Sequence, residues 1–464
     1  MKEITCKLLV IGAGPGGYVC AIRAGQLGID TVIVEAKKPG GTCLTIGCIP
    51  SKALIHAAEE FEKAVHFSEG KNSMGISLSE PKIDLAKTVA WKDSIVTRLT
   101  GGVSGLLKKN KVKVVEGWAR FRDGKTVEVE TEIGTQIIRA ETVVIATGSV
   151  PVELPFLPFG GNVISSTEAL SLDKVPPRLA VVGGGYIGLE LGIAFAKMGS
   201  KVTVVEALPQ LLASYDAELT RPVLKRLAAL GVTVLTNAKA KGLSGKGDAL
   251  LVEVEGESRE IAADKILVTV GRKPLTEGWG LDQIELDMAG RFIRIDDQCR
   301  TSMRGIFAIG DVTGEPMLAH RAMAQGEMVA EIVAGHKRVW DKRCIPAICF
   351  TDPEVVSVGL TPEEAKVQGL ELKIGMFPFA ANGRAMTRLG EDGFVRVVAR
   401  ADNHVVLGIQ AVGQGVSELS AAFGLAIEMG SRLEDIAGTI HAHPTQGEAL
   451  QEAALKALGH ALHI

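Results

Sequence analysis

The segment GGTCLTIGCIPSK, residues 40–52, places two cysteines five positions apart beside a lysine. On a regular helix Cys43 and Cys48 would diverge by roughly 140°, so they can meet only if the backbone between them is irregular. Gly47 permits such a distortion, and Pro50 suits a helix's first turn. We therefore expect a helix that begins near Cys48, where its N-terminal dipole stabilises a thiolate.

Lys52 lies four residues beyond Cys48, so on a helix the two share a face and the lysine charge favours a thiolate. Two alternatives stay open. Cys43 and Cys48 could be unrelated buried cysteines, and Lys52 could be a solvated surface lysine. A zinc site is disfavoured, because two cysteines do not complete a tetrahedral shell and no Cys or His cluster lies nearby. The remaining cysteines carry no pairing signal and are interpreted as packing residues: Cys6, Cys20, Cys299, Cys344 and Cys349.

Two stretches of the chain repeat one pattern. Residues 8–35 read LLVIGAGPGGYVCAIRAGQLGIDTVIVE and residues 179–206 read LAVVGGGYIGLELGIAFAKMGSKVTVVE. Each has an apolar run, a G-x-G-x-x-G turn, a helix-like stretch, a second apolar run and a final Glu, which is the βαβ fingerprint for a dinucleotide. The matched positions, all separated by the same distance, are Gly12 and Gly183, Gly14 and Gly185, Gly17 and Gly188, Gly28 and Gly199, and Glu35 and Glu206.

Each glycine of the fingerprint has its own physical reason. The first permits the tight turn, the second lets the backbone approach the pyrophosphate, and the third lets the helix pack close to the strand. The helix N-terminus then offers free N–H groups to the phosphates. Glu35 and Glu206 can accept hydrogen bonds from ribose hydroxyls. Because Glu206 would repel a 2′-phosphate, the second copy favours NAD over NADP.

Two such units in one chain indicate two dinucleotides that exchange electrons, and a flavin with a nicotinamide is the natural pair. Two more segments, ETVVIATGS at 141–149 and RGIFAIGDV at 304–312, fit an FAD unit to which the chain returns after an insertion. Asp311 then lies at the carboxyl end of a strand, where ligands bind in open α/β sheets. A turn residue or a helix cap is the alternative for Asp311.

The totals limit the remaining possibilities. A chain of 464 residues is too long for one ordinary core, so several domains are expected. The net charge of -3 gives no reason to expect nucleic acid or an anionic membrane surface. The start MKEITCKLLV lacks a signal peptide, and no apolar run reaches the ~20 residues of a membrane span. We expect a cytoplasmic protein without a disulfide scaffold, since its 7 cysteines are sparse.

From about residue 341 the pattern changes to an α+β domain without a third glycine fingerprint. Residues 355–369 and 393–413 read as strands joined by turns, and residues 417–430 and 450–462 read as helices. A large apolar appended domain indicates an oligomer interface. Near its end, in HAHPTQGEA, Glu448 follows His443 and can fix its tautomer and raise its basicity. Such a pair is more often structural, but a redox disulfide that needs a thiol base favours the catalytic interpretation.

Taken together, these motifs resemble those of the pyridine nucleotide–disulfide oxidoreductases, and most closely their dihydrolipoamide dehydrogenase branch. The motifs are GAGPGG, GGTCLTIGCIPSK, GGGYIG, FAIGDV followed by MLAH, and HAHPTQGEA, which span nearly the full length. The resemblance implies an α/β fold with two Rossmann-like dinucleotide-binding domains and a C-terminal α+β dimerisation domain. The implied divisions are an FAD-binding domain at 1–150, an NAD-binding domain at 151–270, a central domain completing the FAD site at 271–340, and an interface domain at 341–464.

The resemblance also implies the site residues. The catalytic set is Cys43 and Cys48 as a redox disulfide, with His443 backed by Glu448 acting in the active site of the partner subunit. The implied FAD contacts are Gly12, Gly14, Gly17, Glu35, Gly41, Thr42, Lys52, Gly117, Thr147, Gly148, Ser149, Asp311, Met317, Leu318, Ala319 and His320. The implied NAD contacts are Gly183, Gly185, Tyr186, Ile187, Gly188, Glu190, Glu206, Ala240 and Gly271, and Glu190 would also pair with Lys52.

The activity so implied is oxidation of protein-bound dihydrolipoamide to lipoamide, with non-covalent FAD and with NAD+ as the acceptor. His443 would take a thiol proton, and the substrate thiolate would attack Cys43, expected to be the more exposed sulfur. The implied partners are a second copy of the chain and the lipoyl-bearing acyltransferase or carrier domains of a 2-oxo acid dehydrogenase complex, with no nucleic acid and no membrane. Thr45, Ile46 and Gly447 depart from the family's usual Asn, Val and Ser.

Four alternative functions can be compared with dihydrolipoamide oxidation. A glutathione-type reductase should carry Arg or Lys near Glu206, and a mercuric reductase should end in a cysteine pair, which KALGHALHI lacks. A flavin transhydrogenase would lack the Cys43–Cys48 pair. A purely structural subunit of a complex would show no turnover with lipoamide and NAD.

Overall fold

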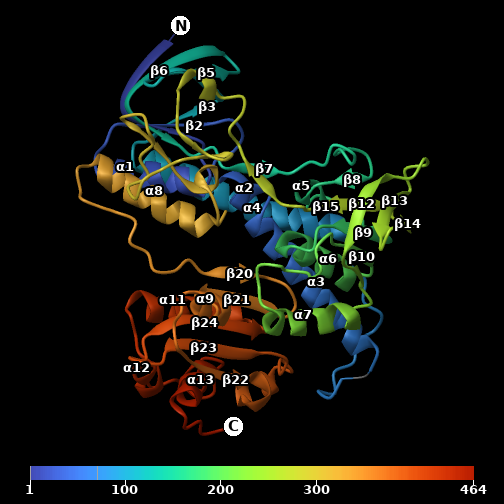
Figure 1. Ribbon diagram of the computed structural model, residues 1–464. Helices are drawn as coiled ribbons and strands as arrows, with labels where there is room; N and C mark the ends of the chain where they lie inside the picture. The colour runs from blue at the N-terminus through green and yellow to red at the C-terminus, as the bar shows by residue number, and fades with distance from the viewer. Residues whose placement is uncertain (1, 71) are drawn as a thin grey trace.

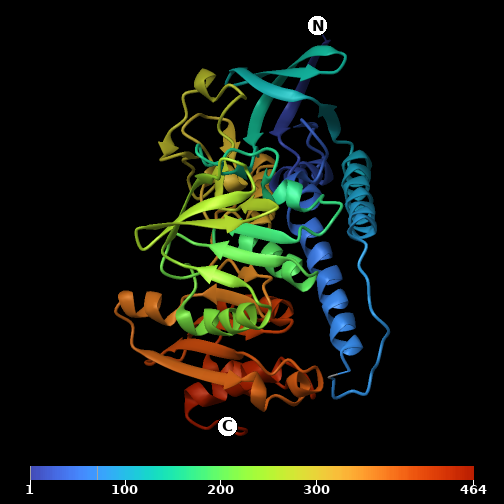
Figure 2. The same cartoon turned by 90° about the vertical axis from the view of Figure 1, so that its right-hand side faces the viewer.

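The computed structural model describes residues 2–70 and 72–464 (Figure 1). The sheet nearest the N-terminus lies at one end of the molecule and the C-terminal sheet at the other, with a parallel sheet between them (Figure 1). Helices α3 (Cys48–Ser68) and α4 (Leu85–Lys109) run alongside each other down one side of the molecule in Figure 2. Among the helices of the described ranges, none has the length and apolar character needed to cross a membrane.

The N-terminal sheet has the order β3 (Lys113–Glu116), β2 (Thr31–Glu35), β1 (Lys2–Ile11), β6 (Gly134–Ile145), β5 (Thr126–Thr131) and β4 (Trp118–Asp123), with β19 (Ile306–Ala308) beside β6. The second half of β1, from Leu8 to Ile11, is buried on both faces, whereas its first half alternates between buried and exposed residues. Leu8 and Val10 pack towards α1 (Pro15–Gln26) and α8 (Ala319–Val333), while Leu9 and Ile11 pack on the opposite face. A parallel strand covered on both sides needs an unbroken apolar run, which explains why LLVI does not alternate.

The second sheet is parallel throughout and has the order β11 (Thr233–Leu235), β10 (Lys201–Val205), β9 (Arg178–Val182), β15 (Lys265–Val268) and β8 (Val163–Ile164). One face packs on the helices α5 (Ser166–Ala169), α6 (Tyr186–Lys197) and α7 (Ala217–Ala229). The other face is covered by an antiparallel ribbon of β12 (Ala238–Leu243), β13 (Ala249–Val254) and β14 (Glu257–Ala262). The two βαβ units expected from the repeated fingerprints are therefore confirmed.

The chain passes between these two units twice. It leaves the first at β7 (Ser149–Pro151) and returns at β16 (Arg272–Pro274), and these strands pair antiparallel. The returning chain forms η1 (Leu281–Gln283), β17 (Met288–Ala289), β18 (Phe292–Ile293), β19, η2 (Gly310–Thr313) and α8. Strand β19 extends the first sheet through Ile306 opposite Val143. The predicted return of the chain to the first unit is confirmed.

The C-terminal sheet is antiparallel, with the order β20 (Ala347–Cys349), β21 (Glu354–Gly359), β24 (Val406–Gly413), β23 (Phe394–Arg400) and β22 (Leu372–Pro378). Helices α11 (Ser420–Glu428), α12 (Leu433–Gly438) and α13 (Glu448–Leu458) share its apolar core. The remaining short elements are η3 (Phe379–Ala381), α10 (Gly383–Thr387) and η4 (Val416–Leu419). This is the α+β domain that the sequence predicts.

One element prediction in this domain is wrong. Residues 355–369 were expected as strands and turns, but Pro362–Val367 form helix α9. Thr361 caps the helix by accepting a hydrogen bond from the Glu364 N–H, and the Glu364 side chain bonds back to the Thr361 N–H. This capping box, with proline at the first helical position, starts a helix directly after β21.

Candidate active site

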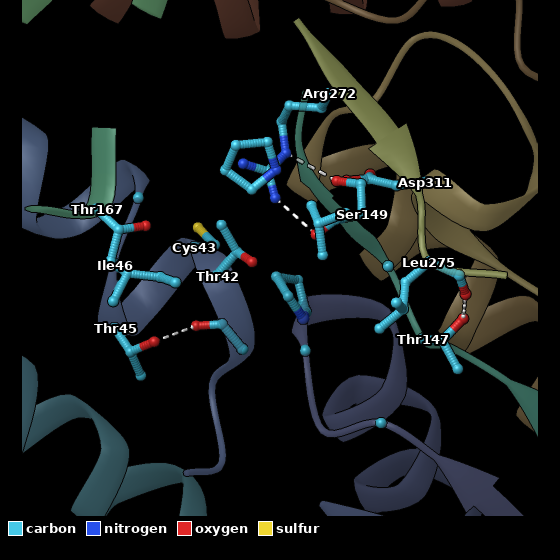
Figure 3. A pocket seen from close by; sticks show the side chains of 18 of the residues that line it. Thr42, Cys43, Thr45, Ile46, Thr147, Ser149, Thr167, Arg272, Leu275 and Asp311 are labelled. Atoms are coloured by element: carbon cyan, nitrogen blue, oxygen red, sulfur yellow. Dashed lines mark hydrogen bonds between the residues drawn. The ribbon is translucent and has the colours of Figure 1, made fainter. Parts of the chain in front are cut away.

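A cavity of about 730 Å³ lies where the first glycine loop, the cysteine segment and the start of α6 meet. In Figure 3 the segment carrying Cys43 lies on one side of the cavity, and Arg272, Ser149 and Asp311 lie on the other. A volume of this size suits a large organic ligand. The cavity therefore joins groups from both βαβ units in one space.

The first glycine loop has the close packing that its fingerprint predicts. Gly12 has φ +97, and a Cβ there would lie 2.4 Å from the Ala146 carbonyl oxygen. A Cβ on Gly17 would lie 1.8 Å from the Gly12 carbonyl oxygen, so the third glycine brings helix α1 against the strand end. Helix α1 begins after Gly14 without a side-chain cap, so the N–H groups that follow Pro15 are uncapped at a helix start that lines the cavity.

Glu35 and Glu206 hold their loops in the same way. Glu35 accepts hydrogen bonds from the backbone N–H of Ala13 at 2.7 Å and of Lys37 at 2.8 Å. Glu206 accepts from Gly184 at 2.6 Å and from Leu208 at 2.7 Å. The carboxylate at the end of the second strand thus stabilises the glycine turn after the first, in both units.

The cysteine pair has the local structure that its spacing predicts. Cys43 lies in the short helix α2 (Gly41–Thr45), and Cys48 begins α3. Between them Ile46 and Gly47 leave helical geometry, with Gly47 at φ -140 and ψ -111. A Cβ on Gly47 would lie 2.8 Å from the Thr42 carbonyl oxygen, so glycine is required at this bend. The irregular backbone brings the two side chains together, as expected.

The two thiols are free and hydrogen-bonded to each other. That bond raises the pKa of Cys43, with burial adding to the rise. The same bond lowers the pKa of Cys48 to about 7, assisted by the charge of Lys52 against the effect of burial. Cys48 is therefore the thiol that ionises first, and Cys43 holds its proton.

The expectation that Cys43 is the more exposed sulfur is wrong for the single chain. Cys48 is exposed and Cys43 is partly buried. Cys48 occupies the first turn of α3 and Cys43 lies within the short helix α2, and both residues line the cavity.

Lys52 joins the first unit to the second through Glu190. The Lys52 Nζ lies 2.7 Å from Glu190 Oε2, and only 4% of the Glu190 side chain is exposed. Glu190 Oε1 accepts a hydrogen bond from the Phe350 N–H at 2.9 Å. A carboxylate this deeply buried is stable because both of its oxygens are paired.

Asp311 takes part in a hydrogen-bonded chain at the opposite wall. The Ser149 hydroxyl donates to Asp311 Oδ2 at 2.5 Å, and Arg272 Nε donates to the same hydroxyl at 2.8 Å. Arg272 also donates to the Ser149 carbonyl oxygen at 2.7 Å, and Thr147 Oγ1 donates to the Leu275 carbonyl oxygen at 2.9 Å (Figure 3). These bonds tie the β7–β16 crossing to the carboxylate beside the cavity.

Most of the predicted flavin contacts line this cavity. They are Gly12, Gly14, Glu35, Gly41, Thr42, Lys52, Gly117, Thr147, Gly148, Ser149, Asp311, Met317 and Ala319, together with Cys43 and Cys48. Gly17, Leu318 and His320 lie outside the lining. The His320 ring faces the Pro346 carbonyl oxygen at 2.9 Å instead.

The predicted nicotinamide contacts divide into two groups. Tyr186, Ile187 and Glu190, at the start of α6, line the same cavity. The others lie outside the lining around the second glycine loop and the neighbouring strands: Gly183, Gly185, Gly188, Glu206, Ala240 and Gly271. Ala240 packs in the core between the second sheet and the antiparallel ribbon.

His443 and Glu448 lie apart from the cavity of their own chain. His443 Nδ1 lies 2.8 Å from Glu448 Oε1, and 79% of the His443 side chain is exposed. Burial would raise the pKa of Glu448, but the Thr445 N–H and the His443 ring hold that pKa below its ordinary value. The pair is thus preformed and faces outward.

Sequence reasoning missed several lining residues. Arg272 follows Gly271 directly, and its only sequence signal is its place next to a glycine that the resemblance implies as a contact. The capping box at Ser165 and Glu168 also reaches the cavity from α5. Phe350 lies outside the lining, but its ring centroid lies 4.3 Å from Lys52 Nζ, and no sequence motif contains it. These contacts arise only where separate units of the chain meet.

Comparisons with known proteins agree with this architecture. The family described as pyridine nucleotide-disulphide oxidoreductase matches residues 6–326, and its dimerisation domain matches residues 345–454. The chain is 62% identical over 459 residues to a dihydrolipoyl dehydrogenase of Pseudomonas aeruginosa, covering 99% of this chain and 98% of the relative. It is 49% identical over 464 residues to a dihydrolipoyl dehydrogenase of Geobacillus stearothermophilus, with 99% and 98% covered.

Solved structures give the same result. LpdA from Mycobacterium tuberculosis is similar with a TM-score of 0.89 at 26% identity, covering 97% of this chain and 99% of that one. The flavoprotein disulfide reductase RclA from Escherichia coli is similar with a TM-score of 0.86 at 26% identity, with 97% and 99% covered. Both matches extend over the two βαβ units and the C-terminal sheet. The chain therefore belongs to the pyridine nucleotide–disulphide oxidoreductase family.

Proposed function

We propose that this chain is a dihydrolipoyl dehydrogenase, which oxidises protein-bound dihydrolipoyl groups and reduces NAD+ to NADH. The observation that carries the proposal is the thiol pair Cys43–Cys48, hydrogen-bonded at the wall of a cavity that also meets the second nucleotide unit. Full-length relatives with this name, at 62% and 49% identity, support the same activity.

FAD fits the cavity by size and by the chemistry of its lining. The first glycine loop offers a close backbone approach, since a Cβ on Gly41 would lie 2.5 Å from the Gly14 Cα. The uncapped start of α1 suits a pyrophosphate, and Glu35 lies where a ribose would lie. Asp311 would hold the ribityl chain, with Lys52 near the reactive ring. FAD, when bound, supplies the ring that takes an electron pair from the thiols and delivers it to NAD+.

NAD+ fits the second glycine loop, which repeats the geometry of the first. Gly183 and Gly188 would form the pyrophosphate turn, and Glu206 would accept from the adenosine ribose. Gly185, Ala240 and Gly271 are proposed as further contacts. Tyr186 and Ile187 would lie at the nicotinamide end, because they reach the same cavity as the cysteines.

The thiol chemistry follows from the ionisation order of the pair. In the oxidised enzyme Cys43 and Cys48 form a disulfide, and a base takes the proton from one substrate thiol. The resulting thiolate attacks Cys43 Sγ, the Cys43–Cys48 bond breaks, and Cys48 leaves as the thiolate that its low pKa favours. The second substrate thiol then attacks the substrate sulfur bonded to Cys43 and gives its own proton to the Cys43 sulfur that leaves. The lipoyl ring closes, the base keeps the first proton, and the electron pair remains on the enzyme as the Cys43 thiol and the Cys48 thiolate.

His443 of the partner subunit is proposed as that base. In its own chain His443 points outward and is already oriented by Glu448. The dimerisation domain that contains the pair supports a homodimer, in which each site would be completed by the other chain. The proposed divisions of the chain remain 1–150, 151–270, 271–340 and 341–464. Lipoyl-bearing carrier domains of a 2-oxo acid dehydrogenase complex would be the partners, and the cytoplasm the location.

The test is an assay of purified holoenzyme with dihydrolipoamide and NAD+, beside the variants Cys43→Ser and Cys48→Ser. The proposal requires turnover by the natural chain, and loss of at least a hundredfold in each variant, with FAD still bound at one per chain. Turnover retained by either variant would contradict the thiol mechanism. Absence of turnover in the natural chain, with FAD bound, would contradict the proposed substrate.

A further inference from the structure

Three parts of the chain that are far apart in sequence meet at one lysine. Lys52 of α3 pairs with Glu190 of α6, and its Nζ lies 4.3 Å from the centroid of the Phe350 ring. Phe350 directly follows β20 of the C-terminal domain, and its backbone N–H donates to the other Glu190 oxygen at 2.9 Å. Figure 1 shows β20 as the edge of the C-terminal sheet that lies nearest the middle of the molecule.

We propose that Phe350 is a positioning residue for the redox pair, because its ring and its backbone N–H together hold the Lys52–Glu190 pair beside Cys48. The inference rests on the proposed function and adds to it a residue of the C-terminal domain. That domain then acts on the thiols of its own chain through Phe350, in addition to any residue that it offers to a partner subunit.

The need for such a residue follows from the nature of lysine. Its ammonium is a point charge on a flexible four-carbon stem, so one salt bridge fixes a distance but does not fix a direction. A cation over an aromatic face gains further stabilisation when the site is partly desolvated. Lys52 is held on one side by a carboxylate and on another by a ring, while 32% of its side chain stays exposed. The ring therefore limits the positions that the charge can take.

The charge matters because it faces the thiol that must ionise. Lys52 lowers the pKa of Cys48, whereas Glu190 acts to raise it. Loss of the ring frees the ammonium but leaves the Glu190 carboxylate in place, because the Phe350 N–H belongs to the backbone. The lowering effect of Lys52 on the Cys48 pKa then weakens, while the raising effect of Glu190 stays. The ionisable groups that interact with Cys48 or with Lys52 are Cys43 of α2, Glu190 and Tyr186 of α6, and the buried thiol of Cys349.

The test compares Phe350→Leu with Phe350→Tyr in the holoenzyme. Leucine keeps an apolar side chain and the backbone N–H but has no aromatic face, and tyrosine keeps the face. After anaerobic reduction by one equivalent of dihydrolipoamide, the Cys48 thiolate is followed by its long-wavelength absorption against the flavin as the pH is lowered. We expect the midpoint for Phe350→Leu to rise by about 0.5 pH unit, which is roughly a threefold fall in the ratio of thiolate to thiol at a given pH. Phe350→Tyr should retain the natural midpoint.

A midpoint for Phe350→Leu equal to that of the natural chain would overturn the proposal, and so would equal shifts in the leucine and tyrosine variants. Phe377→Leu is the matched control, since Phe377 is 2% exposed in the core of the same domain. It should lower thermal stability and leave the midpoint unchanged. If Phe350→Leu does not fold, Phe350→Met gives the same comparison.

The outcomes for the proposal and for the proposed function are distinct. If the natural chain fails to turn over dihydrolipoamide, the reduction is made with dithionite and the thiolate is still titrated. A positioning role for Phe350 can then be contradicted or upheld independently of the substrate.

Discussion

Glu190 lies between Lys52 and Phe350, with Oε2 at 2.7 Å from the lysine Nζ and Oε1 at 2.9 Å from the backbone N–H of Phe350. This one buried carboxylate joins α3, α6 and the C-terminal domain next to the thiol pair. Lys52→Met should leave it without its cation, which we expect to cost roughly 3 kcal/mol of unfolding free energy. The double variant Lys52→Met, Glu190→Gln should recover most of that loss. Denaturant unfolding of the holoenzymes measures both values, and an equal loss in single and double variants would exclude the pairing as the cause.

The ionisation of Cys48 depends on the proton held by Cys43. Because the Cys43 hydrogen bond is the largest cause of the lowered pKa of about 7, thiolate should be lost as the pH falls through that value. Cys43→Ala removes the donor and should raise the midpoint, whereas Cys43→Ser keeps a donor and should raise it less. A titration of long-wavelength absorption in the two variants measures this difference, and it needs no reduction because Cys48 has no partner with which to form a disulfide in either variant. Identical midpoints for the Ala and Ser variants would show that the hydrogen bond has no effect.

Glu35 and Glu206 occupy equivalent places in different units, so they offer matched substitutions. Glu35→Ala removes the acceptor for the Ala13 and Lys37 N–H groups and should weaken FAD retention at least tenfold, seen as flavin lost on gel filtration. Glu206→Ala should retain FAD and raise the KM for NAD+ by about tenfold. An exchange of these effects between the two variants would contradict the assignment of the two sites.

His443 and Cys43 are proposed to act in the same site from different chains. His443→Ala should lower turnover about a hundredfold or more, with FAD content unchanged. Hybrid dimers made from His443→Ala and Cys43→Ser chains then provide a sharp test. Each hybrid holds one site with both groups intact, so about half the natural activity per hybrid should return. Inactive hybrids would indicate that His443 serves its own chain.

Lys197 lies at a buried junction of α3, α6 and the loop after β20. Its Nζ lies 2.8 Å from Asp352 Oδ2, and only 4% of its side chain is exposed. Burial works to raise the pKa of Asp352, but Lys197 and Arg226 outweigh it and hold that pKa below the ordinary value. A depressed carboxyl pKa stabilises the fold above its unfolded value of about 4 and loses that effect as the pH falls. The thermal unfolding midpoint of the natural chain should therefore fall when the pH is lowered below about 4. Asp352→Asn should have a lower midpoint than the natural chain at pH 7, and its midpoint should change less between pH 7 and acid pH.

The sequence by itself determined the parts of this protein that depend on local geometry. Three features follow from turn sterics, helix dipoles and residue spacing, which depend only on residues close together in the sequence. They are the glycine fingerprints, the glutamates Glu35 and Glu206 at the strand ends, and the helix start at Cys48. Helix α9 is not predicted because the Thr361–Glu364 capping box lies between two strands, where a short polar stretch also fits a turn.

Only the tertiary structure decided which distant residues meet in and beside the cavity. Arg272 meets Ser149 where the chain crosses between units, and Phe350 meets Lys52 across three parts of the fold. Such contacts depend on how whole sheets and helices pack, and no periodicity in a single stretch records that packing. For the same reason the spacing of the pair does not show that Cys48 is the more exposed of the two residues, because exposure depends on the assembled surface.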